Sequence, residues 1–148
     1  WTKIAFFMAL FVVVGGLTET GVIKQVAAVI IERTAGHPVM MMLILLWASA
    51  LLSSFLNNIP FIATLIPLVL ALKADGMDAE PLWWAISLGA CLGGNGTMIG
   101  ASANVVLSDI STKHGYPITF KSYLRVGMPF MLGSVFISMV FLLVKYAI

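Results

Sequence analysis

The 148-residue chain has few charged residues, and this shortage excludes an ordinary soluble fold. Charged residues make up 9% of the sequence and hydrophobic residues 61%, with a mean hydropathy of +1.07. Soluble domains carry far more charge. The net charge of +2 also gives no indication of a nucleic-acid partner. We therefore predict an all-α integral membrane protein that passes the cell membrane several times, with the lipid bilayer as its surroundings.

Cysteine is just as scarce, and the usual catalytic motifs are missing. The single Cys91 lies in an apolar run, which excludes a disulfide framework or a thiolate metal cluster and suits a small packing residue. The sequence has no H-E-x-x-H, no G-x-S-x-G and no pair of aspartates within an apolar run. We predict that the protein is not an enzyme and needs no cofactor, with Na⁺ as the one candidate ion.

Several uncharged runs approach or exceed the length that crosses a bilayer, about 20 residues for a hydrocarbon layer of about 30 Å. The run 38–72 is interrupted at Asn57-Asn58-Ile59-Pro60, and its second arm of about 13 residues spans only about 20 Å. This length favours a re-entrant hairpin over 38–72, with two tilted crossings as the alternative. The other predicted segments are a membrane helix over 3–18, an interfacial helix over 20–35, a broken membrane helix over 82–107, an interfacial segment over 109–125 and a membrane helix over 127–147.

The distribution of basic residues predicts the orientation of these segments. The segment 109–125 contains Lys113, Lys121 and Arg125 and is the most basic of the polar stretches. Because loops rich in Lys and Arg tend to stay in the cytoplasm, we place it there and the acidic loop 73–81 outside.

The most informative stretch is 89–106, GACLGGNGTMIGASANVV, where glycine and asparagine interrupt an uncharged run. Backbone that leaves the helix at membrane depth is tolerated only where protein buries it or where it lines a cavity. The 57–60 tip has the same construction. At each interruption a helix start, near Pro60 or Thr97, presents free N–H groups, and a helix end, near Leu56 or Gly93, presents carbonyl oxygens that can coordinate Na⁺.

Neutral polar side chains gather at both interruptions and supply donors and acceptors for a ligand. Small residues at four-residue spacing also serve helix packing, and for serines such as Ser102 and Ser54 the two roles are equally favoured. Packing does not explain why the helix breaks, so a ligand role is favoured for Asn58 and Asn95. The candidate substrate or ion ligands are Ser54, Asn57, Asn58, Asn95, Gly96, Thr97, Ser102 and Asn104, with Na⁺ expected at Asn58, Gly93 and Asn95.

These motifs resemble those of a known family. The stretch GACLGGNGTMIGASANVVLSDISTKHGY, the tip SFLNNIP (54–60) and VVVGGLTETGVI (12–23) are similar to segments of the ion transporter superfamily. Within it the likeness is to the group of arsenite permeases, sodium/proton antiporters and P-protein-type transporters with a citrate-transporter-like domain. The likeness extends over nearly the whole chain.

The resemblance implies a fold and a mode of action. The chain would be the second of two inverted repeats of a secondary transporter, paired with an N-terminal repeat and working as a homodimer by an elevator-like motion. By position, the hairpin-tip role falls on Asn57 and Asn58, and the broken-helix role on Asn95, Gly96 and Thr97. The Ser-Asn-Thr tip of the dicarboxylate carriers is absent, since Ile59 stands in place of the hydroxyl residue.

The function that follows is secondary active transport of a small ion by alternating access. The substrate would be an anion or a metalloid oxyacid such as arsenite, with Na⁺ or H⁺ as the coupling ion. No acidic or basic residue lies in the interrupted runs, so helix dipoles or a co-bound ion would have to balance the charge of the substrate. The alternatives are a non-transporting membrane subunit for packing or assembly, and an ion channel.

Overall fold

The computed structural model describes residues 37–56 and 58–146, with the backbone alone at 59 and 60. Isolated positions nearer the N-terminus are also described: 5, 8, 9, 12, 13, 15, 16, 19–21, 25, 28, 29 and 32–34. Apart from those positions, the helices predicted over 3–18 and 20–35 lie outside the described residues, and so does the candidate ligand Asn57.

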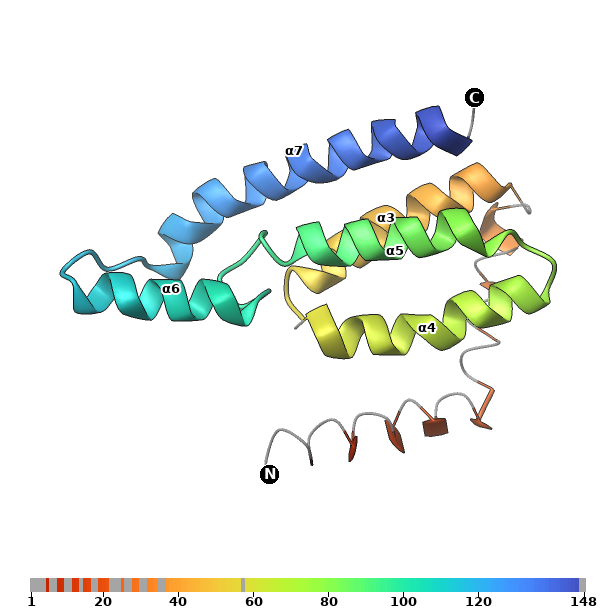
Figure 1. Cartoon of the computed structure of the whole chain (residues 1–148), viewed down its shortest axis with the longest axis horizontal. Coiled ribbons are helices and arrows are strands. Elements are labelled where there is room, and N and C mark those ends of the chain that lie inside the picture. Colours follow the sequence, from red (N-terminus) through yellow and green to blue (C-terminus); the bar gives the residue numbers. More distant parts are fainter. Residues whose placement is uncertain are drawn as a thin grey trace.

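The described part of the chain is helical and contains no strand, so the all-α prediction is confirmed for these residues. The re-entrant hairpin and the discontinuous membrane helix remain predictions. The helices are α3 (Pro38–Ser53), α4 (Asn58–Ala74), α5 (Ala79–Gly93), α6 (Ser102–Lys113) and α7 (Phe120–Tyr146) (Figure 1).

Local signals set the boundaries of these helices. Pro38 occupies the first turn of α3, where its missing N–H costs nothing. Gly76 adopts φ of 91° in the turn after α4, a conformation that favours glycine. The Asp78 side chain accepts a hydrogen bond from the Glu80 N–H at 3.1 Å and caps α5. Each of these signals is legible in the sequence.

The start of α7 differs from the predicted boundary. The helix begins at Phe120, within the stretch 109–125 that was expected to lie at the interface. The Thr119 hydroxyl accepts a hydrogen bond from the Ser122 N–H at 3.2 Å and so caps the helix. Lys121 and Arg125, which were assigned to that interfacial segment, lie in the first turns of α7.

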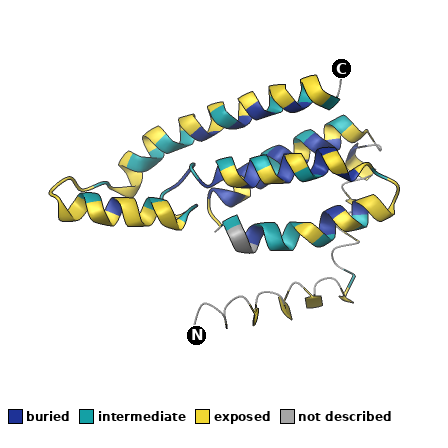
Figure 2. Cartoon of the chain, viewed as in Figure 1, coloured by how far each residue is buried: buried dark blue, intermediate teal, exposed yellow. Residues whose placement is uncertain are grey.

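Helix α5 lies at the centre of the arrangement. Its most extensive contact is with α3, beside which it runs in the same direction, and it also contacts α4 and α7, which run back the opposite way (Figure 1). The buried side chains lie mainly where these helices face one another (Figure 2). The largest fully buried ones in this core are Met41, Met42, Leu46, Val69, Leu72, Leu82, Ile86, Met131, Val135 and Leu142.

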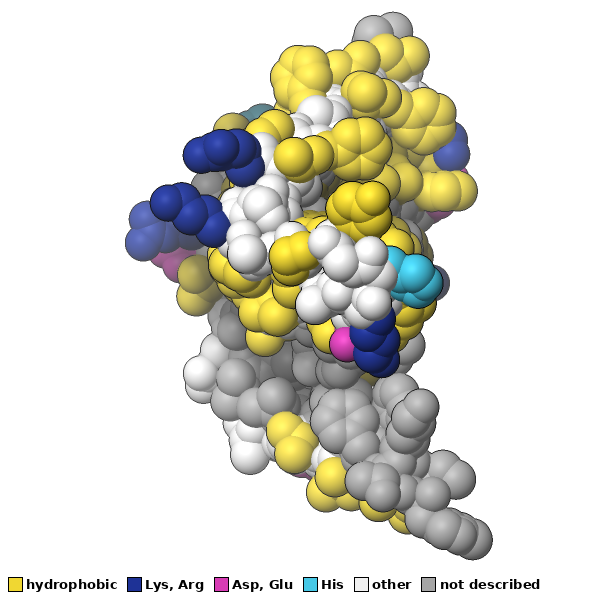
Figure 3. All heavy atoms as spheres, turned by 90° about the vertical axis from the view of Figure 1, so that its left-hand side faces the viewer, with side chains coloured by type: hydrophobic (Ala, Val, Ile, Leu, Met, Phe, Trp, Pro, Cys, Tyr) yellow, Lys and Arg dark blue, Asp and Glu magenta, His cyan; other side chains and the backbone are white. Residues whose placement is uncertain are grey.

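Helix α7 is the one helix in the described residues that is long and apolar enough to cross a membrane. It has 27 residues, its most apolar window has a mean hydropathy of 2.1, and 22% of that window is buried inside the structure. At 1.5 Å per residue, α7 is about 40 Å long. Its exposed large hydrophobic side chains are Phe120, Val126, Phe130, Leu132, Phe136, Ile137, Val140, Phe141 and Val144. The α6 end of the molecule likewise presents many hydrophobic side chains, with Lys and Arg side chains around its margin (Figure 3).

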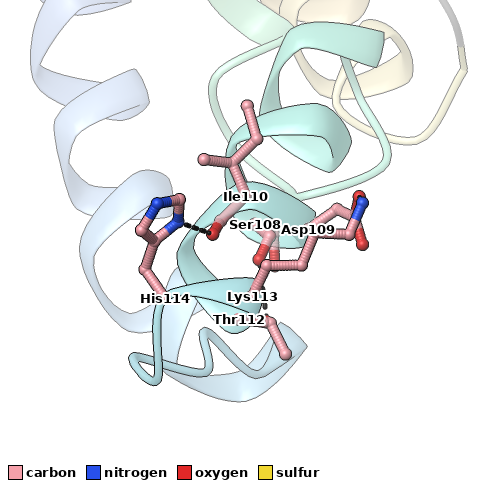
Figure 4. A network of polar contacts seen from close by, with 6 residues as sticks. All are labelled: Ser108, Asp109, Ile110, Thr112, Lys113 and His114. Atoms are coloured by element: carbon pink, nitrogen blue, oxygen red, sulfur yellow. Dashed lines mark hydrogen bonds and ion pairs between the residues drawn. The ribbon is translucent and has the colours of Figure 1, made fainter.

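Helix α6 is the least buried of the five, because Ser108 is its one buried residue. The Ser108 hydroxyl donates to the Ile118 carbonyl at 3.1 Å and ties α6 to the segment that leads into α7. The last turn of α6 holds an ion pair between Lys113 and Asp109 at 2.7 Å and a 2.9 Å contact between His114 Nδ1 and the Ile110 carbonyl (Figure 4). The helix ends where Gly115 adopts φ of 87° and the Tyr116 N–H donates to the Ser111 carbonyl at 3.0 Å.

Candidate functional site

The two interruptions of the helical structure meet in space. One is the turn that follows α3, and the other is the non-helical stretch 94–101 between α5 and α6. The Thr97 hydroxyl donates to the Ser54 carbonyl, and the Ser54 hydroxyl donates to the Gly93 carbonyl at 2.9 Å. Residues some 40 positions apart in the sequence therefore form one junction.

The close packing of α3 and α5 explains why both helices end at the same level. A Cβ on Gly89 would collide with the Ser49 hydroxyl and the Leu46 carbonyl, and one on Gly93 would collide with the backbone of Ala50. Only glycine lets two helices approach this closely. The Ser53 hydroxyl adds a hydrogen bond to the Ala90 carbonyl at 2.7 Å.

The stretch 94–101 is a defined turn rather than an unwound helix. The Asn104 side-chain amide donates to the Gly94 carbonyl at 2.9 Å and to the Thr97 carbonyl at 3.1 Å. The Gly100 N–H donates to the Thr97 hydroxyl at 3.2 Å. A Cβ on Gly100 would lie 2.7 Å from the Gly94 oxygen and 2.8 Å from the Ser54 oxygen, so glycine is required for this closure.

Helix α6 begins at Ser102 instead of near Thr97, where the sequence pattern predicted that the helix would resume. The side chains of Thr97 and Asn104 hydrogen-bond to the intervening backbone, and glycines have a low helix propensity. Ser102 is exposed at the start of α6, and the capping position before it, Ala101, makes no side-chain hydrogen bond. The free N–H groups at this helix start are thus five residues beyond the expected place.

Three candidate ligands use their donors inside the chain. Ser54, Thr97 and Asn104 each donate to backbone carbonyls of the junction. The Gly93 carbonyl, a candidate ligand for Na⁺, accepts from the Ser54 hydroxyl and from the Gly96 N–H at 2.9 Å. A carbonyl oxygen has two lone pairs, so both are occupied in this arrangement. The hydrogen bonds of these residues hold the junction together.

Asn58 is different, because the oxygen of its side-chain amide has no hydrogen-bond partner among the described residues. The residue begins α4, and its amide nitrogen lies 3.8 Å from the Cys91 sulfur of α5. The side-chain oxygen is buried and makes no hydrogen bond in the described part of the chain. A buried acceptor without a partner is costly, and a bound ion or hydrogen-bond donor is one arrangement that would satisfy it. Asn58 is the candidate best placed to receive a cation or a hydrogen-bond donor.

Asn95 lies on the α7 side of the junction. It is half-buried and lines a cavity of about 440 Å³, and a Cβ on Gly127 of α7 would lie 2.7 Å from the Asn95 backbone oxygen. Gly96 is buried beside it, where a Cβ would lie 2.6 Å from the Ser54 hydroxyl. Besides Asn95, the cavity is lined by Ile118, Ser122, Tyr123, Val126, Gly127 and Phe130.

The structure therefore places the two favoured asparagines on different sides of the junction. Asn58 contacts Cys91 where α4 meets α5, whereas Asn95 faces the beginning of α7. The polar cavity residues Ser122 and Tyr123 were missed by the sequence reasoning, because 109–125 was assigned to an interfacial segment. The Thr119 cap is the signal that would have placed them on a helix.

Comparison with known proteins supports a transporter. Residues 1–89 match the model of a family described as citrate transporter (CitMHS). The chain is 43% identical over 156 residues to the P protein of Homo sapiens, with 100% of this chain and 19% of that protein covered. It is 38% identical over 151 residues to a 46 kDa membrane protein of Mycobacterium leprae, with 100% of this chain and 35% of that protein covered.

A third relative is an uncharacterized transporter of Mycobacterium tuberculosis, 39% identical over 150 residues, with 99% of this chain and 35% of that protein covered. The chain thus spans between about a fifth and about a third of the length of these curated relatives. No solved structure matches it.

Proposed function

Because this chain belongs to the citrate transporter family, we propose that it forms one inverted-repeat half of a secondary active transporter. In this proposal a small ion binds at the junction of the 54–58 turn and the 93–97 break and crosses the membrane by alternating access. The coupling ion is Na⁺ or H⁺, and the complete protein is a multi-pass homodimer whose other repeat supplies the rest of the site.

The meeting of two helix interruptions is the observation that carries the proposal. The C-terminal ends of α3 and α5 meet there through the Ser54–Gly93 hydrogen bond, and α4 begins beside α5 at Asn58. The carbonyls of a helix end suit a cation, and the N–H groups of a helix start suit an anion. Asn58, with its unpartnered oxygen, lies at the edge of this junction. In a bilayer such an arrangement is stable only where protein or a ligand satisfies the backbone.

Neutral groups at the junction favour a small ion of low charge. The described residues from 50 to 58 and from 89 to 104 include no acidic or basic side chain. The charge of the substrate would therefore be balanced by backbone dipoles or by a co-transported ion. A chloride-like anion, arsenite or another oxyacid fits this requirement better than a multiply charged species alone.

The packing alternative accounts for less of the structure. Gly89 and Gly93 fit against α3 of the same chain, so this small-residue surface is already covered and does not remain for assembly with another subunit. Packing also leaves the burial of the Asn58 oxygen unexplained. A channel would have the same junction but a conductance far above the turnover of a carrier.

Uptake into vesicles tests the proposal. The full-length protein and its Asn58→Ala and Asn95→Ala variants are reconstituted, and uptake of ²²Na⁺, ³⁶Cl⁻, arsenite and citrate is measured. We expect at least one of these ions to be taken up, with uptake reduced at least tenfold in each variant at equal protein incorporation. A Ser134→Ala control, in which the lost hydroxyl bonds only within α7, should transport normally. Normal uptake in both asparagine variants would refute the assignment of the site.

The path of α3 and α4 through the membrane needs its own test. A re-entrant hairpin places the turn at residue 55 inside the membrane, whereas two crossings expose it on the far side. Cys91 is the sole cysteine of these 148 residues, so Cys91→Ser with Phe55→Cys leaves one reporter thiol in this part of the protein. We expect this thiol to resist a membrane-impermeant maleimide added from the side opposite the 73–81 loop. Rapid labelling from that side would establish two crossings.

A further inference from the structure

The first turns of α7 carry two cations that have no partner among the residues the structure describes. Lys121 and Arg125 are exposed, and neither forms an ion pair or a side-chain hydrogen bond within the described residues. The first turn of α7 has no acidic residue. The positive end of the helix dipole disfavours cations at a helix start. In this turn, therefore, neither the dipole nor an acidic side chain balances the charges of Lys121 and Arg125.

The two side chains border one shallow depression, open to the surroundings and lined by α7 alone, which we call the groove. Residues four apart lie on the same face of a helix, about 6 Å apart, which is close enough for both to contact one phosphate group. The groove has a volume of about 380 Å³, and its other lining residues are apolar: Leu124, Met128 and Pro129. It therefore combines a cationic edge with an apolar floor.

The groove continues along α7 as an apolar stripe. Leu132 and Phe136 follow Met128 at intervals of four residues and are both exposed. Pro129 has no N–H, so the Arg125 carbonyl lacks its usual helical donor and is available to a hydroxyl or ammonium group. A molecule that fits has an anionic head, hydrogen-bond donors beside it, and a hydrocarbon chain.

We propose that this groove binds an anionic phospholipid, with the phosphate between Lys121 and Arg125 and one acyl chain along Leu124, Met128 and Leu132. The position agrees with the cytoplasmic side assigned to 109–125, because that leaflet carries most anionic lipid. Arg and Lys at the end of a spanning helix reach the headgroup layer by extending their apolar stems. The proposal does not depend on what the junction transports.

Lipid-dependent melting of the full-length protein in dodecyl maltoside tests the groove. The added probes are dioleoyl phosphatidylglycerol, dioleoyl phosphatidylcholine and inorganic phosphate, each over a concentration series. We expect phosphatidylglycerol to raise the melting temperature by several degrees, phosphatidylcholine and phosphate to leave it nearly unchanged, and 0.5 M NaCl to weaken the effect, because a ligand of the folded state stabilises it.

Substitutions test whether Lys121 and Arg125 cause the rise in melting temperature with phosphatidylglycerol. Lys121→Gln with Arg125→Gln should weaken the phosphatidylglycerol response at least tenfold in lipid concentration. Lys113→Gln is the matched control, because it removes one nearby exposed cation that is already paired with Asp109. It should retain the full response. Native mass spectrometry of retained lipid gives a second readout if the double variant melts at a different temperature without lipid.

Three results would overturn the proposal. An unchanged phosphatidylglycerol response in the double variant would place the lipid elsewhere. An equal loss in Lys113→Gln would indicate diffuse attraction rather than a groove. An equal response to inorganic phosphate would indicate a site for a free anion instead of a lipid.

Discussion

At its C-terminal end α5 is joined to α3 by buried, neutral groups, whereas at its N-terminal end it is joined to α7 by exposed charges. The first end is held by the Ser54 hydroxyl and by the fit of Gly93 against Ala50. At the second end the Glu80 carboxylate accepts from the Tyr146 hydroxyl at 2.7 Å and lies 3.5 Å from the Lys145 ammonium. The same helix is thus fixed by two different kinds of chemistry.

This difference predicts which end of α5 tolerates substitution. A buried hydrogen bond is costly to break because the abandoned partner has no water to replace it. An exposed ion pair is screened and easily replaced by water. We therefore expect the end of α5 at the junction to be rigid and sensitive to substitution, and the opposite end to be adaptable.

The largest effect should come from Gly93→Ala. The added methyl group would collide with the Ala50 backbone, which cannot move aside as a side chain can. Overpacking of this kind costs about 3 kcal/mol. Thermal unfolding in detergent measures it, with Gly133→Ala as control, because a Cβ on Gly133 meets nothing within 4 Å and should slightly stabilise α7. Equal melting temperatures for the two variants would show that the close contact of α3 and α5 is not rigid.

Thr97→Val should have the next largest effect. It leaves the buried Ser54 carbonyl of the junction without its partner, while the Gly100 N–H keeps the Thr97 carbonyl as an acceptor, at a cost of about 2 kcal/mol. The matched control is Thr112→Val, in which the lost hydroxyl bonds only to the Ser108 carbonyl of its own helix. The two melting curves should differ by several degrees. If they coincide, the two interruptions are held together by something other than Thr97.

The smallest effect is expected from Glu80→Gln at the exposed end of α5. The hydrogen bond from Tyr146 is the main cause that holds the pKa of the Glu80 carboxyl below its ordinary value of 4.5. A lowered pKa means that Glu80 stabilises the fold above pH 4.5 and that this contribution fades as the pH falls through the lowered pKa. Melting at pH 7 should change little, and wild type and variant should converge in acid. A fall in melting temperature as large as that of Thr97→Val would contradict the difference between the two ends of α5.

The sequence predicted the helical class and an interruption in each of the two runs, because glycine and asparagine disturb a helix whatever surrounds them. It did not predict the bounds of these interruptions, since α3 already ends at Ser53 and α6 begins only at Ser102. It did not predict that Ser54, Thr97 and Asn104 would bond to the backbone across the junction, since that depends on how α3 and α5 pack. Nor did it predict the cavity beside Asn95. That cavity needs Gly127, whose small size lets α7 approach the break.

The central claim is that the junction binds an ion and that Asn58 helps to hold it. The most direct measurement is the melting temperature of the full-length protein with and without NaCl, sodium arsenite or citrate, using choline methanesulfonate as reference. We predict that at least one ion raises the melting temperature of the wild type, that Asn58→Ala abolishes this rise, and that Thr112→Val keeps it. An equal rise in Asn58→Ala, or no rise with any of these ions, would contradict the account.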